Sequence, residues 1–143
     1  MVPVYPMMGM ATMEVNLNGG VPMAGHAILA YVPDLMFAVH LREAAAKSQN
    51  TVSIVETRGD FETRLPEVHP ALAVLDLTAS GSATAALVTL AGQYDCRVIA
   101  YGPHVQKTLL AQAREAGCVA VYAKSVFKME TAKILRKWLG DMG

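Results

Sequence analysis

Residues 71–77 read Ala-Leu-Ala-Val-Leu-Asp-Leu, a nearly continuous apolar run whose single charge, Asp76, comes close to its end. Apolar residues that follow one another without alternation are typical of a strand covered by helices on both faces. The run therefore predicts the central strand of a parallel sheet. Asp76 is expected at the carboxyl end of that strand.

Similar runs lie on both sides of this stretch, and amphipathic segments separate them. The predicted strands are residues 27–32, 51–56, 71–77, 97–101 and 119–123. The predicted helices are residues 34–47, 60–65, 82–91, 104–116 and 126–139. Asp34 and Ser82 are the expected N-caps of the first and third helices, since Asp and Ser side chains accept hydrogen bonds from free backbone N–H groups.

Five strands that alternate with five helices predict an α/β protein, because parallel neighbours need a crossover helix and such crossovers are right-handed. We expect a flavodoxin-like three-layer sandwich with the strand order 2-1-3-4-5. In the first helix, the expected core contacts are Leu35, Val39, Leu41 and Ala45. In the last helix, they are Phe127, Thr131, Ile134, Leu135 and Trp138.

The composition narrows the class of protein. The 143 residues suit one domain, and 53% hydrophobic against 17% charged residues excludes disorder for most of the chain. The formal net charge is zero, which gives no overall attraction to nucleic acid or to anionic lipid. The most apolar stretch, residues 21–39, is interrupted by Pro33 and Asp34, and no Lys or Arg precedes Arg42. We therefore expect a cytoplasmic protein with neither a membrane span nor a secretory signal.

Residues 1–25 differ from the rest, since they hold six of the nine methionines and show no clear period. We interpret them as an N-terminal appendage, and residues 26–143 as the folded domain. The appendage is either a small hairpin that turns at Asn18-Gly19-Gly20, a tag, or residues upstream of a natural start at Met23.

Two charged residues stand at predicted strand ends, Asp76 after the third strand and Lys124 after the fifth. In this arrangement, residues 27–139 resemble the CheY-like receiver domains of response regulators. The matching segments are Ile28-Leu29-Ala30-Tyr31, Leu72-Ala73-Val74-Leu75-Asp76-Leu77, Val98-Ile99-Ala100-Tyr101, Ala113-Arg114-Glu115-Ala116-Gly117-Cys118 and Ala123-Lys124-Ser125. The resemblance implies a phosphorelay signalling module in which Asp76 stands at the phosphoacceptor position and Lys124 at the position of the family's lysine.

The sequence departs from the family at positions that the chemistry needs. Receivers hold Mg²⁺ with an acidic pair after the first strand, where this chain has Val32-Pro33. The hydroxyl after the fourth strand is matched by Gly102, and the proline after the lysine by Ser125. The family's aromatic switch residue aligns with Val121, so the neighbouring Tyr122 should point to the opposite face.

These departures predict a pseudo-receiver that acts by phosphorylation-independent protein–protein interaction or dimerisation, with Asp76 and Lys124 as an ion pair. It would have no catalytic residue, no cofactor and no metal. Two alternatives stay open. In the first, Asp76 accepts a phosphoryl group, with Asp34 helping to hold Mg²⁺ and slow autodephosphorylation as the sole activity. In the second, a small anion binds the loop at residues 78–82. Asp34, Thr78 and His104 are expected at the pocket rim.

The partner is expected to be a protein or a second copy of the chain, bound through the last two helices and the fifth strand. Residues 1–96 hold four basic and nine acidic side chains, and residues 97–143 hold eight and three, so the surface is expected to be polarised. The interface residues would be Lys128, Lys133, Arg136, Lys137 and Trp138. No nucleic-acid or membrane partner is expected. The other polar candidates are unremarkable: Cys96 and Cys118 are expected to be reduced core thiols, and the four histidines to be surface residues without metal-ligand spacing.

Overall fold

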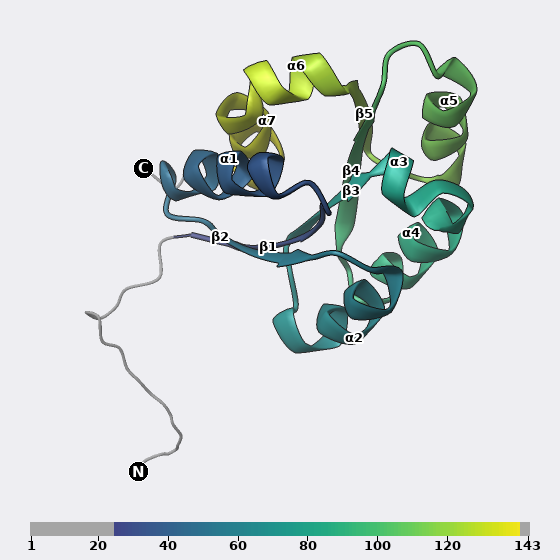
Figure 1. The fold of residues 1–143 in the computed structure, drawn as a ribbon. Helices are drawn as coiled ribbons and strands as arrows, with labels where there is room; N and C mark the ends of the chain where they lie inside the picture. The colour runs from purple at the N-terminus through teal and green to yellow at the C-terminus, as the bar shows by residue number, and fades with distance from the viewer. Residues whose placement is uncertain (1–24, 141–143) are drawn as a thin grey trace.

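The computed structural model describes residues 25–140. The proposed appendage therefore lies, except for Gly25, outside the described residues. Strands and helices alternate as Figure 1 shows. The strands are β1 (Ala27–Tyr31), β2 (Thr51–Val55), β3 (Leu72–Asp76), β4 (Arg97–Gly102) and β5 (Ala120–Ala123). The helices are α1 (Leu35–Ala46), α2 (Arg58–Val68), α3 (Leu77–Ser80), α4 (Thr84–Gln93), α5 (Lys107–Ala116), α6 (Lys124–Met129) and α7 (Thr131–Leu139), with a 3₁₀ turn, η2, at Gly81–Ala83.

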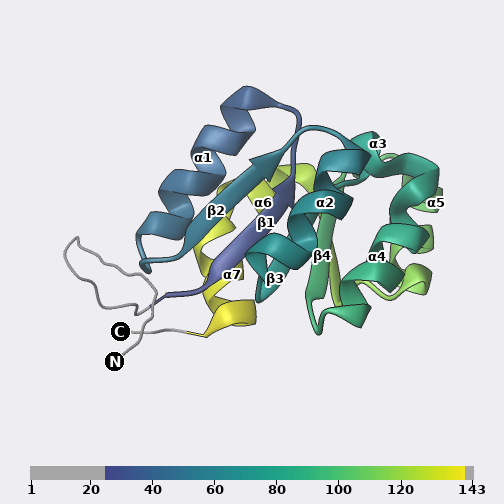
Figure 2. The same ribbon diagram turned by 90° about the horizontal axis from the view of Figure 1, so that it is seen from below.

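The sheet confirms the predicted topology. All four strand pairs are parallel, and the order is β2-β1-β3-β4-β5. The central strand is β3, which pairs Ile28 of β1 with Leu72 on one side and Asp76 with Tyr101 of β4 on the other. Figure 2 shows the helices packed on both faces of this sheet. The fold is therefore the flavodoxin-like three-layer sandwich.

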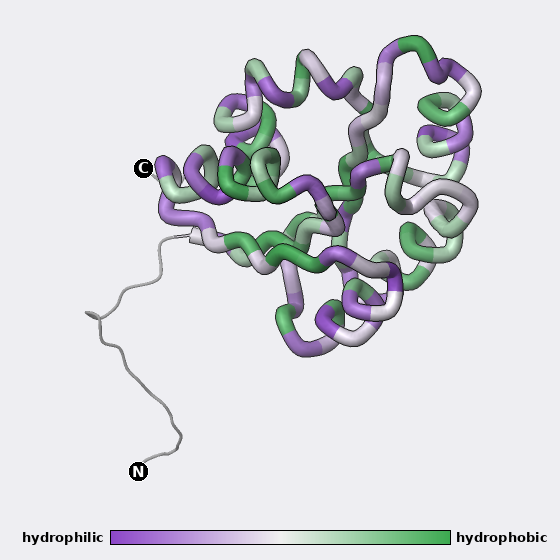
Figure 3. Tube along the Cα trace, in the orientation of Figure 1, coloured by the Kyte–Doolittle hydropathy of each residue, from purple (hydrophilic) through white to green (hydrophobic). Residues whose placement is uncertain are grey.

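Each face of the sheet has its own apolar core. Alternate strand residues such as Leu72 and Val74 pack with α1, α6 and α7, whereas Ala73 and Leu75 pack with α2, α3, α4 and α5. In Figure 3 the hydrophobic strands lie toward the centre of the fold, and the hydrophilic segments lie mainly on its outside. Within residues 25–140, no helix has the length and apolar content that crossing a membrane requires.

The expected core contacts of α1 are half wrong. Leu41 and Ala45 are buried as predicted, but Leu35 is 73% exposed and Val39 is 46% exposed. The helix is turned so that Phe37, Ala38 and Ala44 face the sheet instead. Because nearly every residue of the first two turns is apolar, the sequence pattern could not fix which side is buried.

The C-terminal helix is also not continuous. It divides into α6 and α7 at Glu130, whose backbone (φ −118°, ψ 25°) is not helical. The predicted apolar stripe nevertheless holds on both pieces, since Phe127, Thr131, Ile134 and Leu135 are buried. The stripe survives because the break changes the direction of the chain without changing the side that faces the sheet.

The segment after β3 differs from the prediction in its start. Ser82 is not a helix cap, because it lies within the 3₁₀ turn, and no side chain caps the start of α4. Asp76 itself begins the segment as the N-cap of α3. Two other helices have different bounds from those predicted: α2 continues through Pro66 to Val68, and α5 begins at Lys107 rather than residue 104.

Candidate functional site

The candidate site lies at the carboxyl ends of β1, β3, β4 and β5, where ligands bind in open parallel sheets. Alternation along β3 and β4 places two side chains on the face covered by α1 and α6: Asp76 follows Val74 by two positions, and Tyr101 packs in that core directly. Lys124, the first residue of α6, lies on the same side, where it lines a cavity with Phe37 of α1. The first helix adds Asp34 at its N-cap.

Asp76 ends β3 and is partly buried. One carboxylate oxygen, Oδ1, accepts a hydrogen bond of 3.0 Å from the backbone N–H of Thr78 and so caps the short helix α3. The predicted position at the end of the third strand is therefore correct. The carboxylate also accepts a hydrogen bond from a free N–H at a helix start, which the sequence analysis did not predict.

Lys124 pairs with a different carboxylate from the one expected. Among the described residues no ion pair joins Lys124 to Asp76, and the Lys124 Nζ lies 3.9 Å from Oδ2 of Asp34. Asp34 also caps α1, since its Oδ1 accepts a 3.2 Å hydrogen bond from the N–H of Phe37. Both side chains of the pair are nearly half exposed, so its contribution to stability is small.

Tyr101 is the site residue that sequence reasoning missed. It stands opposite Asp76 in the β3–β4 register, and its ring is stacked on Phe127 with centroids 5.1 Å apart. The side chain is fully buried, and its hydroxyl has no hydrogen-bond partner among the described residues. Burial raises the Tyr101 pKa well above its usual range, and the carboxylates of Asp76 and Asp34 raise it further. An aromatic residue among apolar β4 residues gave no signal of this position.

Gly102 was matched to the hydroxyl residue of receivers, but it lies on the other face of the sheet from Asp76. A Cβ built there would meet Leu110 Cδ2 at 3.2 Å and Leu77 Cβ at 3.4 Å. Glycine is therefore explained by close packing against α3 and α5. The residue that pairs with Asp76 on β4 is Tyr101. The match of Gly102 to the hydroxyl position of receivers stays a prediction.

The remaining candidates line the edge without joining a common site. Val32 is buried and Pro33 is exposed. Neither residue has a carboxylate that could bind a metal ion after β1. Three others are exposed: Thr78, His104 and Ser125. The prediction for β5 is confirmed, because Val121 packs with the α2–α5 core and Tyr122 with the opposite one.

The loop at residues 78–82 borders a cavity of about 490 Å³ between α4 and α5. The buried hydroxyls of Ser80 and Thr84 hydrogen bond to each other at 2.7 Å, so neither is free for a ligand. The cavity is lined by Gly81, Ser82 and the carboxylate-bearing Glu115 among others. This lining does not favour an anion.

The residues at the edge do not fit a Mg²⁺ site. Mg²⁺ requires near-octahedral oxygen ligands, usually from more than one carboxylate. Within residues 25–140 no cluster of three or more His, Cys, Asp or Glu side chains is suited to hold a metal ion. The two nearest carboxylates, Asp34 and Asp76, are each oriented by a helix start.

The comparisons with known proteins place this arrangement in a wider fold group. No family model matches the chain, and no curated protein matches its sequence. Solved structures do match. A response regulator from Thermotoga maritima aligns with a TM-score of 0.69 and 17% identity, over 78% of this chain and 95% of that one. A response regulator from Hahella chejuensis aligns with a TM-score of 0.69 and 15% identity, over 82% and 97%.

A third similar structure is a pilus assembly-related protein from Burkholderia pseudomallei, with a TM-score of 0.65 and 16% identity, over 87% of this chain and 94% of that one. At these identities the likeness concerns the fold. The chain therefore has the fold of response-regulator receiver domains, in agreement with the resemblance drawn from its sequence.

Proposed function

We propose that the chain is a receiver-like signalling module that acts through phosphorylation-independent protein–protein interaction. The observation that carries this proposal is the use of both carboxylates at the carboxyl edge of the sheet as helix caps. A phosphoacceptor aspartate needs a metal ion beside it to offset the repulsion between two anions. Here the acidic pair is replaced by Val32 and Pro33, and Asp34 is paired with Lys124.

The position of Lys124 supports the same proposal. Lys124 would bind a phosphoryl oxygen if Asp76 were modified, but its nearest anion is Asp34. The hydroxyl beside Asp76 belongs to Tyr101, whose ring fills the core between Phe37 and Phe127. The proposed module has no enzymatic activity and uses no cofactor.

The competing proposal makes Asp76 a phosphoacceptor that uses Mg²⁺. Incubation with acetyl phosphate and Mg²⁺, followed by intact-mass spectrometry, separates the two. In the phosphoacceptor case, a carboxylate oxygen of Asp76 attacks phosphorus and acetate leaves. We expect no phosphoryl adduct under conditions that label an ordinary receiver domain run alongside. An adduct on the parent chain that is absent from Asp76→Asn would overturn the proposal.

We further propose that the partner surface includes α5, β5 and the α6–α7 segment, with Lys128, Lys133, Arg136, Lys137 and Trp138. The Trp138 side chain is half-buried and donates a 2.8 Å hydrogen bond from Nε1 to the Tyr122 hydroxyl. Arg97 and Lys137 lie over its ring at 5.9 and 5.3 Å. This arrangement ties α7 to β4 and β5, and it presents cations around an aromatic anchor.

A further inference from the structure

The first two turns of α1 carry an apolar stripe that no other described residue covers. Leu35 is 73% exposed, Met36 is 81% exposed and Val39 is 46% exposed. Their positions at i, i+1 and i+4 place them on one side of the helix. Three large apolar side chains together on one exposed helical face are more than the single exposed residues that soluble surfaces ordinarily show.

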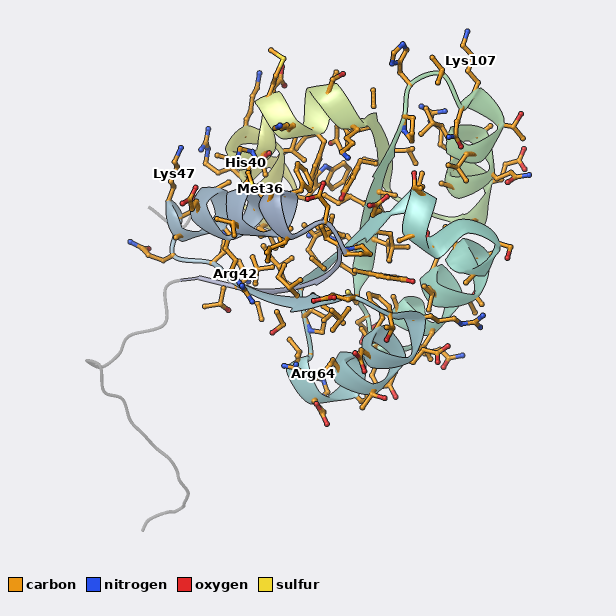
Figure 4. The ribbon with its side chains drawn as sticks, viewed as in Figure 1. Met36, His40, Arg42, Lys47, Arg64 and Lys107 are labelled. Carbon is orange, nitrogen blue, oxygen red and sulfur yellow. The ribbon has the colours of Figure 1, made fainter. Side chains whose placement is uncertain are left out.

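A cavity of about 250 Å³ adjoins this stripe, between α1 and α6. Met36, Phe37 and His40 line it from α1, Asp34 lines it from the N-cap of that helix, and Lys124 and Lys128 line it from α6. Figure 4 shows Met36 and His40 on the side of α1 that looks toward α6. We call the stripe and the cavity together the α1–α6 groove. The α1 wall carries the apolar Met36 and Phe37 beside His40, and the α6 wall carries two ammonium groups. Lys124 is paired with Asp34, whereas Lys128 forms no ion pair among the described residues.

The layer that contains the groove is basic. Residues 34–47 and 124–139, which comprise α1, α6, α7 and their caps, hold seven Lys and Arg against three Asp and Glu. Residues 48–123 hold five against seven. The charge difference follows the two faces of the sheet. An acidic partner is therefore attracted to the α1–α6–α7 layer and steered away from the other face.

We propose that the α1–α6 groove binds an acidic amphipathic helix of a partner protein. Apolar residues spaced i, i+3, i+4 and i+7 on that helix cover Leu35, Met36 and Val39, and one of them enters the cavity. Carboxylates on its flank meet Lys128, and they meet Lys124 beside its existing partner Asp34. This inference rests on the proposed interaction function, and it names the surface and the chemistry of the partner.

A protein helix fits the groove better than a nucleic acid does. Phosphate backbones are bound by basic and polar side chains, and their affinity comes from displaced counterions rather than from apolar contact. Here the most exposed side chains are a leucine and a methionine, which only an apolar ligand surface would cover. Methionine is also flexible enough to adapt to a partner's side chains.

The test uses the full chain and two fluorescein-labelled 18-residue peptides. Both carry leucine at i, i+3, i+4 and i+7, one with glutamate at the flanking positions and the other with lysine. Fluorescence anisotropy measures binding. We expect the glutamate peptide to bind about tenfold more tightly at low salt, with the difference shrinking as salt is added. Equal binding of the two peptides would overturn the inference.

Variants then locate the binding. Met36→Glu is expected to weaken binding of the glutamate peptide by about tenfold, and Lys124→Ala with Lys128→Ala by a smaller factor with a reduced salt dependence. Met129→Glu is the matched control, because Met129 is equally exposed (83%) but does not line the cavity. A loss in the control as large as that in Met36→Glu would overturn the assignment. Urea unfolding checks that each variant is folded.

Other occupants would give distinct results. If sedimentation shows a dimer that Met36→Glu dissociates, a second copy fills the groove and the acidic-helix proposal is wrong. A 20-base-pair DNA probe that binds more tightly than the glutamate peptide would equally reject it. Asp76→Asn separates the two proposals: peptide binding lost in this variant contradicts phosphorylation-independent action, whereas binding that depends on Lys133 and Arg136 but not on Met36 contradicts the groove alone.

Discussion

Each carboxylate at the carboxyl edge of the sheet satisfies the backbone of a helix start, and this shapes what the edge can do. Asp34 holds the first turn of α1 and Asp76 holds the start of α3. A side chain that accepts from a backbone N–H has a fixed orientation and one fewer free lone pair. The orientation of these two carboxylates is therefore set by the fold and not by a ligand.

Gly102 gives a prediction about close packing. Gly102→Ala should lower the free energy of unfolding by about 1 kcal/mol, because the new Cβ would lie 3.2 Å from Leu110 Cδ2. Gly92→Ala is the matched control, since its Cβ would meet nothing within 4 Å inside α4. This control should raise the stability by about 0.5–1 kcal/mol. Urea denaturation measures both, and equal effects would contradict the packing argument.

Cys96 gives a prediction about alkaline pH. Burial raises the pKa of its thiol to about 11 from an ordinary value of 9.0, although Arg97 opposes this shift. The folded chain thus keeps the proton where the unfolded chain loses it. The stability is fully present below pH 9 and falls as the pH rises toward 11. The loss attributable to Cys96 is on the order of 2 kcal/mol.

The measurement is the free energy of unfolding from pH 7 to 11 for the parent and for Cys96→Ala. The variant should lose less stability over this range than the parent does. Tyr101 and Cys118, whose pKa values are also raised, are present in both proteins and cancel in the difference. Parallel curves would show that Cys96 does not contribute.

The candidate site was predicted in part from single residues. Asp76 and Lys124 stand at strand ends as expected, because the end of each continuous apolar run marks where the strand stops. Tyr101 was missed, since a tyrosine within an apolar strand predicts only a core residue. The partner of Lys124 was also wrong, because a sequence does not show which of two carboxylates a flexible lysine reaches.

The α6–α7 junction depends on a histidine from another helix. The Nε2 of His40 lies 2.9 Å from the carbonyl oxygen of Lys128 and 3.0 Å from Oγ1 of Thr131. A carbonyl oxygen only accepts, so Nε2 carries the proton. Thr131 in turn donates to the carbonyl of Phe127. Carbonyls left free at the end of α6 are thereby satisfied, and His40 is not the plain surface residue that its sequence context predicted.

Loss of this contact should destabilise the C-terminal layer. His40→Ala is expected to lower the free energy of unfolding by about 1–2 kcal/mol, because partly buried carbonyl and hydroxyl groups lose their donor. His104→Ala serves as the control, since His104 is exposed and makes no hydrogen bond among the described residues. Thermal melting of both variants tests this. A melting temperature lowered equally by both would contradict the proposed role of His40.

Element boundaries were less predictable than element types. No proline or glycine in the sequence marks the break at Glu130. The contact from His40 to Lys128 at this break joins residues far apart in the chain, so a local sequence pattern does not predict it. In α1 the difficulty was different. Leu35, Met36, Phe37 and Val39 are all apolar, so the direction of the buried face was set by packing of Phe37 against Tyr101 and Phe127.

The two apolar cores share one five-stranded sheet, and this predicts a single cooperative unfolding unit. The lone tryptophan, Trp138, reports on the core beneath α1, α6 and α7, whereas Leu87 is fully buried in the opposite core. Leu87→Ala should lower the stability by about 2–5 kcal/mol. The same shift should appear in tryptophan fluorescence and in far-UV circular dichroism.

Two outcomes differ clearly. Coincident transitions mean that β1, β3 and β4 transmit the loss from one face of the sheet to the other. A tryptophan transition that stays at the parent midpoint while the dichroism shifts would mean that the faces unfold separately. Leu35→Ala is a suitable control, because that exposed side chain should leave both transitions unchanged.

The overall topology was the most predictable level. Continuous apolar runs separated by amphipathic segments require parallel strands with crossover helices, and handedness then leaves few arrangements. The order β2-β1-β3-β4-β5 follows that reasoning. The tilt of α1 and the depth of Tyr101 depend on side-chain volumes in contact, which no periodic pattern contains.

The helix-capping carboxylates have a consequence for any attempt to restore phosphoryl chemistry. Replacing Val32 and Pro33 by aspartates would gather four carboxylates around the single ammonium group of Lys124, at an edge whose existing anions cannot turn away. Like charges at such short range repel strongly unless a divalent cation binds. We therefore expect the melting temperature of the doubly substituted chain to rise with each addition of magnesium.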